Sequence, residues 1–489
     1  MPTSEAPALV WFRDDLRIAD NPALTRAAAS GRPVIALYVL DEISPGIRPS
    51  GGARRWWLHR SLTALGADLA RLGIALVLRR GAAGAIVPAL AAALGAGLVA
   101  WNRRYRAAEI EVDRAIKADL AAKGHAPESF QAHLLHEPWS IRSKADEPFR
   151  VFTPFWRSAC AGAEPRLPLP APAPGRGLQA MPASDRLEDW GLLPARPDWS
   201  GGIAAAWTPG EAGAAVRLKT FLEDEFAGYA ERRDRPDLPS TSRLSPHLAF
   251  GEISPFQIRQ AACHAVESGR SAASRRDLDK FLAELGWREF SYHLLGQFPD
   301  MERRNIQPRF DAFPWQPDPA LLSAWQRGRT GIPMVDAGMR QLWQTGWMHN
   351  RVRMICGSFL VKHLLQDWRT GEAWFHDTLV DADPASNPAS WQWVAGSGAD
   401  AAPYFRVFNP VLQGEKFDPD GAYVRRFVPE LAGLPSAYLH APWTAPAALL
   451  AAAGIRLGST YPRPVVDVAV GRDRALAAFD QLKASQAAA

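Results

Sequence analysis

The chain has 489 residues, of which 47% are hydrophobic and 22% charged, a composition typical of a soluble globular protein with two or three domains. Its three cysteines are widely spaced and form no CxxC pair, which argues against a disulfide scaffold and a cysteine-based zinc site. The formal net charge of +5 is a weak indication of an anionic partner.

No segment has the pattern of a signal peptide or a membrane span. Residues 1–13 lack a basic start followed by an apolar stretch. The longest uncharged run, residues 85–101, contains Pro88, Gly95 and Gly97 and is shorter than the roughly 20 residues of a spanning helix. We expect this run to be a helix end, a turn and a buried strand, in a cytoplasmic protein with no membrane contact.

The first third of the chain alternates short apolar runs with helical patterns. This alternation predicts a parallel sheet with helices on both faces, and such sheets bind nucleotides or cofactors at the carboxyl ends of their strands. No GxGxxG follows the first run and no GxxxxGK[ST] occurs, which disfavours NAD-type and P-loop chemistry. The predicted strands are 9–12, 34–40, 74–78 and 98–101, and the predicted helices are 21–30, 53–72, 82–94 and 107–123.

The remainder of the chain has a different residue pattern. Residues 165–175 are rich in proline and predict an extended connector, and the pattern from residue 211 onward is mainly helical. We therefore expect an α/β domain over 1–135, a connector over 136–206 and a helical domain over 207–480. The clearest predicted helices of this part are 214–229, 277–295, 334–344, 351–367 and 370–379.

Tryptophan usage is unusual, with 19 Trp against 8 Tyr, and many of these residues fall within 346–410. A tryptophan must bury a large ring while its indole N–H finds a partner. Its concentration here indicates oxidisable or stacking π-surfaces, as needed for a flavin, electron transfer or flipped bases.

The acidic segment 381–387 lies just before Trp391 and Trp393 in the sequence. A calcium loop would need Asp or Asn, then Gly, and finally Glu at the positions held by Ala385, Ser386 and Gln392, so a metal site is not predicted. The alternatives are a solvated turn and a cofactor-facing loop, and the neighbouring tryptophans favour the second.

Three further groups of residues indicate binding. The hydroxyls of Thr-Ser-Arg-Leu-Ser-Pro at 241–246 suit a pyrophosphate, although a plain helix cap is the alternative. Glu284, Trp287 and Arg288 share a helix face, which predicts either a surface ion pair with a core tryptophan or a site for an extruded base. The phosphate-contact candidates are Arg233, Arg351, Arg353 and Arg406, each of which could instead be a surface solubiliser.

These motifs together resemble the DNA photolyase/cryptochrome family over nearly the whole chain. The matching segments are Trp-Phe-Arg-Asp-Asp-Leu-Arg at 11–17, Thr-Ser-Arg-Leu-Ser at 241–245, Trp-Arg-Glu at 287–289, Gly-Ile-Pro-Met-Val-Asp-Ala-Gly-Met-Arg at 331–340, Trp-Met-His-Asn-Arg at 347–351 and Phe-Asn-Pro at 408–410. The resemblance implies a Rossmann-like α/β domain, a long connector and an all-α domain that binds FAD. The FAD contacts that it implies are Tyr229, Thr241, Ser242, Arg243, Leu244, Ser245, Trp287, Asn350, Asp381, Asp383 and Asn387.

The resemblance also implies an activity, the light-dependent repair of cyclobutane pyrimidine dimers (CPDs) in DNA by a lyase. Photoexcited FADH⁻ would donate an electron, the cyclobutane ring would split, and the electron would return. Asn387 corresponds to the residue facing flavin N5 and favours repair over the alternative, a blue-light receptor that signals through partners. Asn350 and Met354 match the CPD pattern rather than the histidine pair of (6-4) enzymes, and Glu284 would bond the pyrimidine carbonyls. The implied DNA contacts are Arg233, Glu284, Trp287, Arg288, Asn350, Arg351, Arg353, Trp393, Arg406 and Gln413.

The tryptophans divide by the same comparison. Trp391, Trp368 and Trp315 match the family's electron-hopping chain, which reduces oxidised flavin in light. Trp325, Trp343 and Trp347 are expected to be core residues.

An antenna pigment is implied by segments 51–62 and 101–105, which resemble the class III bacterial photolyases. That subgroup binds methenyltetrahydrofolate, and a deazaflavin remains open. Glu109 matches a folate-contacting Glu of another class, but Ala108 replaces its preceding Asn. The other antenna candidates are Asp41, Glu42, Trp56 and Trp57. We expect a monomer with no obligate protein partner.

Overall fold

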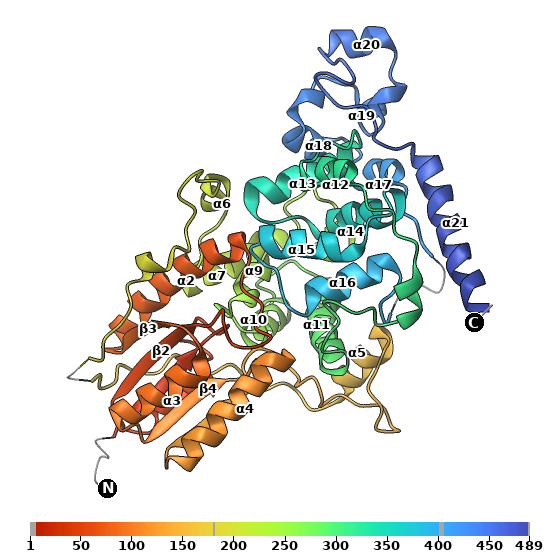
Figure 1. The fold of residues 1–489 in the computed structure, drawn as a ribbon. Coiled ribbons are helices and arrows are strands. Elements are labelled where there is room, and N and C mark those ends of the chain that lie inside the picture. Colours follow the sequence, from red (N-terminus) through yellow and green to blue (C-terminus); the bar gives the residue numbers. More distant parts are fainter. Residues whose placement is uncertain (1–5, 179–180, 401–404, 488–489) are drawn as a thin grey trace. The chain divides into compact units, whose positions relative to one another are not determined.

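The computed structural model describes residues 6–178, 181–400 and 405–487, and the chain divides into two compact units (Figure 1). The limits of the first unit are Met1–Ala227 and Ser242–Pro299, and those of the second are Gly228–Thr241 and Asp300–Ala489. The elements of the first unit are β1 (Ala8–Phe12), α1 (Pro22–Ala28), β2 (Val34–Leu40), α2 (Gly52–Arg71), β3 (Ala75–Arg80), α3 (Ala83–Leu94), β4 (Leu98–Asn102), α4 (Ala107–Ala122), β5 (Ala126–Phe130), α5 (Phe152–Ala161), η1 (Leu187–Trp190), α6 (Gly201–Ala206), α7 (Glu211–Thr220), η2 (Phe221–Glu225), α9 (Ser245–Ala249), α10 (Pro255–Glu267) and α11 (Arg275–Gln297).

The second unit is helical throughout its described residues. Its elements are α8 (Tyr229–Arg232), η3 (Pro308–Ala312), α12 (Pro319–Gln326), α13 (Pro333–Thr345), α14 (Asn350–Ser358), η4 (Phe359–His363), α15 (Trp368–Thr378), α16 (Ser386–Ala395), α17 (Pro410–Phe417), α18 (Ala422–Phe427), η5 (Pro429–Leu431), α19 (Ser436–Leu439), η6 (Pro442–Thr444), α20 (Ala447–Ala452) and α21 (Val468–Ala487). Among the described residues, no helix is long and apolar enough to cross a membrane.

The first unit contains the predicted parallel sheet. Within the described residues its five strands have the order β3-β2-β1-β4-β5. Strands β1, β2 and β4 are buried along their whole length, as expected for a parallel sheet covered on both faces. Helices α3 and α4 pack on one face through a shared apolar cluster, and they lie side by side in Figure 1. The α/β prediction is confirmed.

Strand β5 was not predicted. Its sequence, Ala-Pro-Glu-Ser-Phe, has neither a continuous apolar run nor a clean alternation of apolar and polar residues. It lies at the edge of the sheet, where Pro127 costs no ladder hydrogen bond and partial exposure tolerates Glu128. The pairing with β4, rather than local sequence, decides its conformation.

The strand order reverses between β1 and β4, which makes this carboxyl edge the topological switch point. The side chains of Asn102, Asp15 and Asn21 are hydrogen-bonded to one another at this edge. Asn102 donates through Nδ2 to Asp15 Oδ2 at 2.6 Å and to Asn21 Oδ1 at 2.8 Å. This edge is therefore held together by internal hydrogen bonds.

The core of the second unit lies among α13, α14, α15, α16 and α18. One predicted helix of this core, residues 351–367, is interrupted. The α-helix ends at Ser358, the turn Phe359–His363 is a π-helix, and Leu365 has a positive φ of 50°. A π-helical turn holds more residues than an α-helical one and recurs at functional sites. The turn places Lys362 and His363 in buried positions.

Burial keeps His363 uncharged. The side chain is 0% exposed, neither ring nitrogen has a hydrogen-bond partner within the described part of the chain, and the ring stacks on Phe359 at 5.2 Å. This burial lowers the pKa of His363 to about 4 from 6.5. Between those two pH values the unfolded chain binds a proton that the folded chain does not. The contribution to stability is thus complete above pH 6.5 and falls with pH, by up to about 3 kcal/mol.

Replacing His363 with phenylalanine should remove this acid sensitivity while keeping a ring against Phe359. Denaturant unfolding at about pH 7.5 and pH 5 measures it, and the wild type should lose about 2 kcal/mol more than the variant on acidification. The matched control is His264→Phe, on the exposed surface of α10, which should behave as the wild type does. An identical pH dependence for His363→Phe and wild type would contradict the assignment.

Candidate functional site

The acidic loop between α15 and α16 is buried, so the solvated-turn alternative is wrong. Asp381 is 5% exposed and accepts a hydrogen bond on Oδ2 from Arg353 at 2.8 Å, while its Oδ1 has no partner within the described residues. Asp383 accepts hydrogen bonds from the backbone N–H groups of Ala385 and Ser386, at 2.9 and 2.7 Å. Asp383 thus caps the start of α16, and Asp381 presents a buried carboxylate oxygen that lacks a donor.

Helix α16 carries three of the predicted site residues, Asn387, Trp391 and Trp393. The Asn387 amide is fixed by α15, since its Nδ2 donates to the carboxylate of Glu372 at 2.9 Å and to the Glu372 carbonyl at 3.2 Å. This assignment leaves Asn387 Oδ1 as the atom with which the side chain can accept a hydrogen bond.

The predicted electron-chain tryptophans are held by specific contacts. Trp391 is 3% exposed, with Phe375 at 5.0 Å between ring centroids, and a Cβ added at Gly371 would lie 2.2 Å from its ring. Trp368 is buried and donates through its indole nitrogen to Asn305 at 2.9 Å. Trp315 is partly buried and packs against Phe313 at 4.4 Å. Their role as an electron chain stays a prediction.

Two of the three tryptophans expected in the core lie there. Trp325 and Trp347 are buried. The prediction for Trp343 is wrong, since it is 54% exposed and stacks on Trp374 with an interplanar angle of 9°. Trp343 lies on the solvent-exposed side of α13, and the Trp374 indole, rather than the core, covers part of its ring.

The N-terminal end of α14 gathers several predicted residues. His349 caps the helix by accepting a hydrogen bond from the backbone N–H of Arg351, which gives this histidine a structural role. Asn350 is exposed and Met354 is half-buried. Arg351 pairs with Asp234 at 2.6 Å.

Other predicted contacts of the second unit lie on separate segments. Tyr229 begins α8 and is buried, while Arg233 pairs with Asp234 at 3.3 Å and Thr241 is half-buried. Gln413 lies half-buried on α17, and Arg406 is exposed. Their proposed ligand contacts are untested.

In the first unit, Glu284, Trp287 and Arg288 all lie on α11, as predicted. The indole of Trp287 is stacked on Phe152 of α5, with ring centroids 3.7 Å apart and an angle of 10°. Glu284 forms a surface ion pair at 3.2 Å with Lys280 one turn earlier, a residue outside the predicted group. Arg288 donates to the backbone carbonyl and ring of His133 at 2.8 and 2.6 Å, so its guanidinium is engaged within the unit.

The hydroxyl segment of the first unit runs from Ser242 to Ser245. The Ser242 carbonyl accepts from Arg217 at 2.9 Å, and Arg243, with a positive φ of 51°, lies over the Trp207 ring at 4.4 Å. Leu244 is buried and precedes Ser245, the first residue of α9. Leu244 is the cap residue and provides no side-chain hydrogen bond, so the alternative of a plain hydroxyl cap at this position is not supported.

The antenna candidates have partners within the first unit. Asp41 accepts from the backbone of Ile43, Ser44 and Ala83, and Glu42 pairs with Arg55 and Arg80. Trp57 donates to Glu252 at 2.9 Å, and Trp56 is buried beside it. Glu109 bonds the backbone of Arg106 at 3.3 Å and pairs with Arg104 at 3.5 Å. These polar groups are used in holding the unit together.

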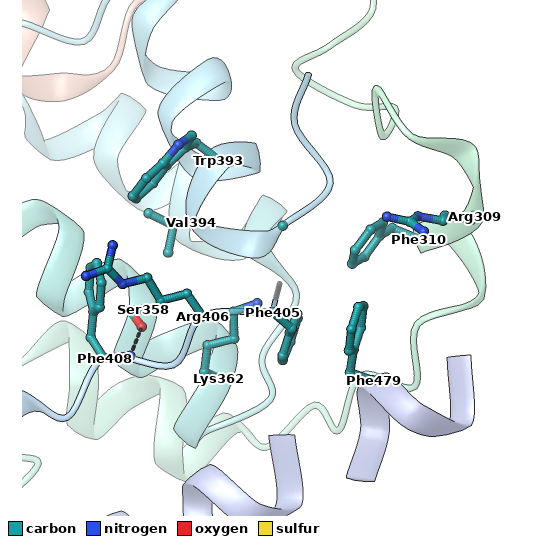
Figure 2. Close-up of a pocket in the computed structure, with 11 residues that line it drawn as sticks. Arg309, Phe310, Ser358, Lys362, Trp393, Val394, Phe405, Arg406, Phe408 and Phe479 are labelled. Carbon is teal, nitrogen blue, oxygen red and sulfur yellow. Dashed lines mark hydrogen bonds between the residues drawn. The ribbon is translucent and has the colours of Figure 1, made fainter. Parts of the chain in front are cut away.

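A small pocket of about 50 Å³ lies within the second unit (Figure 2). Only Trp393 and Arg406 of its lining were predicted as site residues. Sequence reasoning missed Lys362, whose one signal was a lysine inside the apolar run 359–365. The lining residues are Arg309, Phe310, Ser358, Lys362, Trp393, Val394, Gly396, Phe405, Arg406, Phe408 and Phe479. Within the described residues, no group of His, Cys, Asp and Glu could hold a metal ion.

Comparisons with known proteins agree with this fold of a parallel-sheet unit and a helical unit. A family model described as DNA photolyase matches residues 8–174, and one described as the FAD binding domain of DNA photolyase matches residues 281–481. The deoxyribodipyrimidine photo-lyase of Agrobacterium fabrum is 52% identical over 483 residues, covering 99% of both chains. Cryptochrome-1 of Arabidopsis thaliana is 38% identical, covering 99% of this chain and 72% of its own.

A solved structure is similar over the same length. The bacterial class III photolyase of Agrobacterium tumefaciens superposes with a TM-score of 0.95 at 51% identity, covering 99% of both chains. Full-length identity above one half, with two ordered family matches, leaves no other family to consider. The chain belongs to the DNA photolyase/cryptochrome family.

Proposed function

We propose that this protein is a deoxyribodipyrimidine photo-lyase, which uses light and FAD to split cyclobutane pyrimidine dimers in DNA. The observation that carries the proposal is the buried Asp381 beside α16. Its Oδ1 has no hydrogen-bond donor within the described residues, and the nearby Asn387 amide is fixed by Glu372. The full-length similarity to a protein named deoxyribodipyrimidine photo-lyase supports the same reaction.

The residues present fit FAD. A flavin offers N–H and hydroxyl donors, which match Asp381 Oδ1, unpartnered within the described residues, and the acceptor oxygen of the Asn387 amide. Arg353 already balances the charge of Asp381. When bound, FAD would supply the photoexcitable one-electron donor. The remaining proposed contacts are Tyr229, Thr241, Ser242, Arg243, Leu244, Ser245, Trp287, Asn350 and Asp383.

Position 387 favours an amide for a physical reason. Its Nδ2 lies 2.9 Å from the Glu372 carboxylate, which is buried. An aspartate there would bring two carboxylates within hydrogen-bond distance, and like charges so placed cannot both ionise. The asparagine supplies a donor to Glu372 and keeps an acceptor for the flavin edge.

The proposed lesion contacts include residues of each of the two units. Phe152 covers one face of the Trp287 indole, so a pyrimidine would stack on the opposite face, a contact worth about 1–3 kcal/mol. Glu284 would hydrogen-bond the pyrimidine carbonyls. Asn350, Met354 and Trp393 would complete the dimer contacts. Arg233, Arg288, Arg351, Arg353, Arg406 and Gln413 are proposed to contact DNA.

Replacing Glu284 with alanine tests this proposal. Loss of a hydrogen bond to the reacting dimer, worth about 1.5–3 kcal/mol, should slow splitting by roughly 10- to 150-fold and leave the flavin absorption spectrum intact. Blue-light repair of a dimer-containing oligonucleotide by pre-reduced protein measures it. Lys280→Ala, which removes the ion pair but keeps the carboxylate, is the matched control and should repair at nearly the wild-type rate. Unchanged repair by Glu284→Ala would show that the lesion pocket is misassigned.

The alternative function is a blue-light receptor that signals through protein partners. The 38% identity to Cryptochrome-1 over 99% of this chain is the observation in its favour. A receptor without repair activity would leave dimers intact under blue light, whereas the proposed lyase restores both pyrimidines.

We further propose methenyltetrahydrofolate as the antenna, with a deazaflavin as the alternative. The absorption spectrum and mass of the pigment released from purified protein distinguish the two. A monomer without an obligate protein partner, located in the cytoplasm, likewise remains a prediction from the sequence.

A further inference from the structure

The indole N–H of Trp368 is hydrogen-bonded to the side-chain amide of Asn305. It donates to Asn305 Oδ1 at 2.9 Å, and Asn305 Nδ2 in turn donates to the carboxylate of Asp311 at 2.7 Å. An indole N–H only donates and an ionised carboxylate only accepts, so these two neighbours fix which end of the amide faces the ring. Trp368 and Asn305 are buried, whereas the Asp311 side chain is 62% exposed. The amide thus separates the buried indole from a carboxylate at the surface.

The group that accepts the indole N–H decides what happens to its proton when the ring is oxidised. A tryptophan that loses one electron carries a positive charge, which makes its N–H much more acidic. A base hydrogen-bonded to it would take the proton and leave a neutral radical, which is a weaker oxidant. An amide oxygen accepts the hydrogen bond but does not titrate in the range of protein side chains. The amide of Asn305 therefore suits retention of the proton.

The charged groups around Trp368 tolerate a positive ring. Arg369 lies over the ring at 4.9 Å, and a cation there opposes oxidation of the indole. Its guanidinium pairs with Asp367 at 3.0 Å and has Asp311 at 3.8 Å. Two carboxylates for one guanidinium leave one negative charge, which favours an oxidised ring. The indole N–H itself is bonded to Asn305 instead of to either carboxylate.

Trp368 is the middle member of the proposed electron chain. It lies in the same buried cluster as Trp391, and Trp315 packs against that cluster from a partly exposed position. When light drives one electron from Trp391 to oxidised FAD, Trp368 gives one electron to Trp391, and Trp315 then gives one to Trp368. The positive charge ends on Trp315, which is nearer the solvent and releases its proton to water. Loss of the Trp368 proton before the last transfer would interrupt this sequence.

We propose that Asn305 keeps Trp368 protonated while it is oxidised and so lets the positive charge pass on to Trp315. Asn305 acts through Trp368 rather than on FAD, so it is a positioning residue of the electron chain. The inference rests on the proposed function through bound FAD and the chain Trp391, Trp368 and Trp315. It deepens that function, because it gives control of the middle tryptophan's proton to a residue outside the predicted site.

The experiment exchanges the amide and the carboxylate. Asn305→Asp combined with Asp311→Asn keeps one group of each kind and places the base on the indole N–H. The exchange is made in flavin-loaded protein that also carries Trp315→Phe, so that the positive charge stops at Trp368. Transient absorption after a laser pulse distinguishes a tryptophan cation radical from a neutral radical. The Trp315→Phe protein should show the cation-radical band until the electron returns, and the exchanged protein should lose this band and show the neutral radical.

Two further measurements accompany this comparison. Asp311→Asn alone, in the Trp315→Phe background, is the matched control and should keep the cation-radical band, because the amide still bonds the indole. In the dark, flavin-loaded protein labelled with ¹⁵N-tryptophan gives a readout without photochemistry. The indole N–H resonance that Trp368→Phe removes should move to lower field in the exchanged protein, since hydrogen bonds to carboxylates are shorter. If the exchanged protein does not fold, Asn305→His replaces it at about pH 8, where imidazole is a neutral base, with the same expected loss of the band.

Two results would overturn the proposal. Identical transient spectra in the folded exchanged protein and the Trp315→Phe protein would leave Asn305 as a structural partner of Trp368. A neutral radical in the Trp315→Phe protein, where the amide is intact, would show that Asn305 does not retain the proton. Repair by pre-reduced protein needs no electron from the chain, so a failure of the proposed repair function would appear in the repair assay and leave these spectra unchanged.

Discussion

Replacing Asp336 with alanine should lower the free energy of unfolding by about 4 kcal/mol or more. Asp336 is completely buried on α13, and its carboxylate accepts four hydrogen bonds. The donors are the backbone N–H groups of Thr330 and Gly331, the Thr330 hydroxyl and the Tyr461 hydroxyl, at 2.6 to 3.0 Å. Alanine leaves all four donors buried, and each unsatisfied group costs about 1–3 kcal/mol.

Denaturant unfolding at neutral pH measures this loss. Asp336→Asn keeps the shape and one acceptor oxygen, so it should lose less than the alanine variant. Tyr461→Phe removes a single donor together with its bond and should cost about 1 kcal/mol. An alanine variant within 1 kcal/mol of the wild type, on the scale of one ordinary hydrogen bond, would contradict the assignment of a fully used carboxylate.

Replacing Trp391 with phenylalanine should slow photoreduction of oxidised FAD by at least about tenfold, equivalent to about 1.4 kcal/mol of activation free energy. Phenylalanine is much harder to oxidise than tryptophan, yet it retains an aromatic ring against Phe375 in this buried position. Repair by pre-reduced protein should continue, because it needs no electron from the tryptophan chain. Absorption during blue-light illumination measures photoreduction.

The matched control for this prediction is Trp343→Phe, since Trp343 is half-exposed on α13 and lies outside the proposed chain. It should photoreduce as the wild type does. Normal photoreduction in Trp391→Phe would rule out the proposed chain as the only route, and a slow rate in both variants would indicate a general disturbance of the unit.

Local sequence patterns were sufficient for most of the first unit. Strands β1, β2 and β4 are buried on both faces, so their sequences are continuous apolar runs. Such runs can be predicted as strands from the local sequence alone. Strand β5 is polar and lies at the edge, and only its pairing with β4 makes it a strand. In the same way the uncharged run 85–101 was correctly divided, since Gly95 adopts the left-handed conformation at the end of α3.

The candidate site was predictable in its residue types and less so in its contacts. The order of motifs along the chain determined the family, and with it the roles proposed for Asp381, Asn387 and Trp391. Tertiary structure decided which atoms are free to act. Arg353 bonds one oxygen of Asp381, while the other lacks a donor among the residues that the structure describes, and Asn387 keeps its acceptor because Glu372, 15 residues away, takes its amide.

The sequence by itself therefore determined strands β1 to β4 and the family, since each depends on local periodicity or on ordered motifs, and it predicted which side chains react. Only the tertiary structure revealed the π-helical turn, the buried Lys362 and His363, and the stacking of Phe152 on Trp287. Each of these depends on groups that are far apart along the chain. The free energy of a buried charge or ring is set by those neighbours, and no local pattern encodes which neighbours they will be.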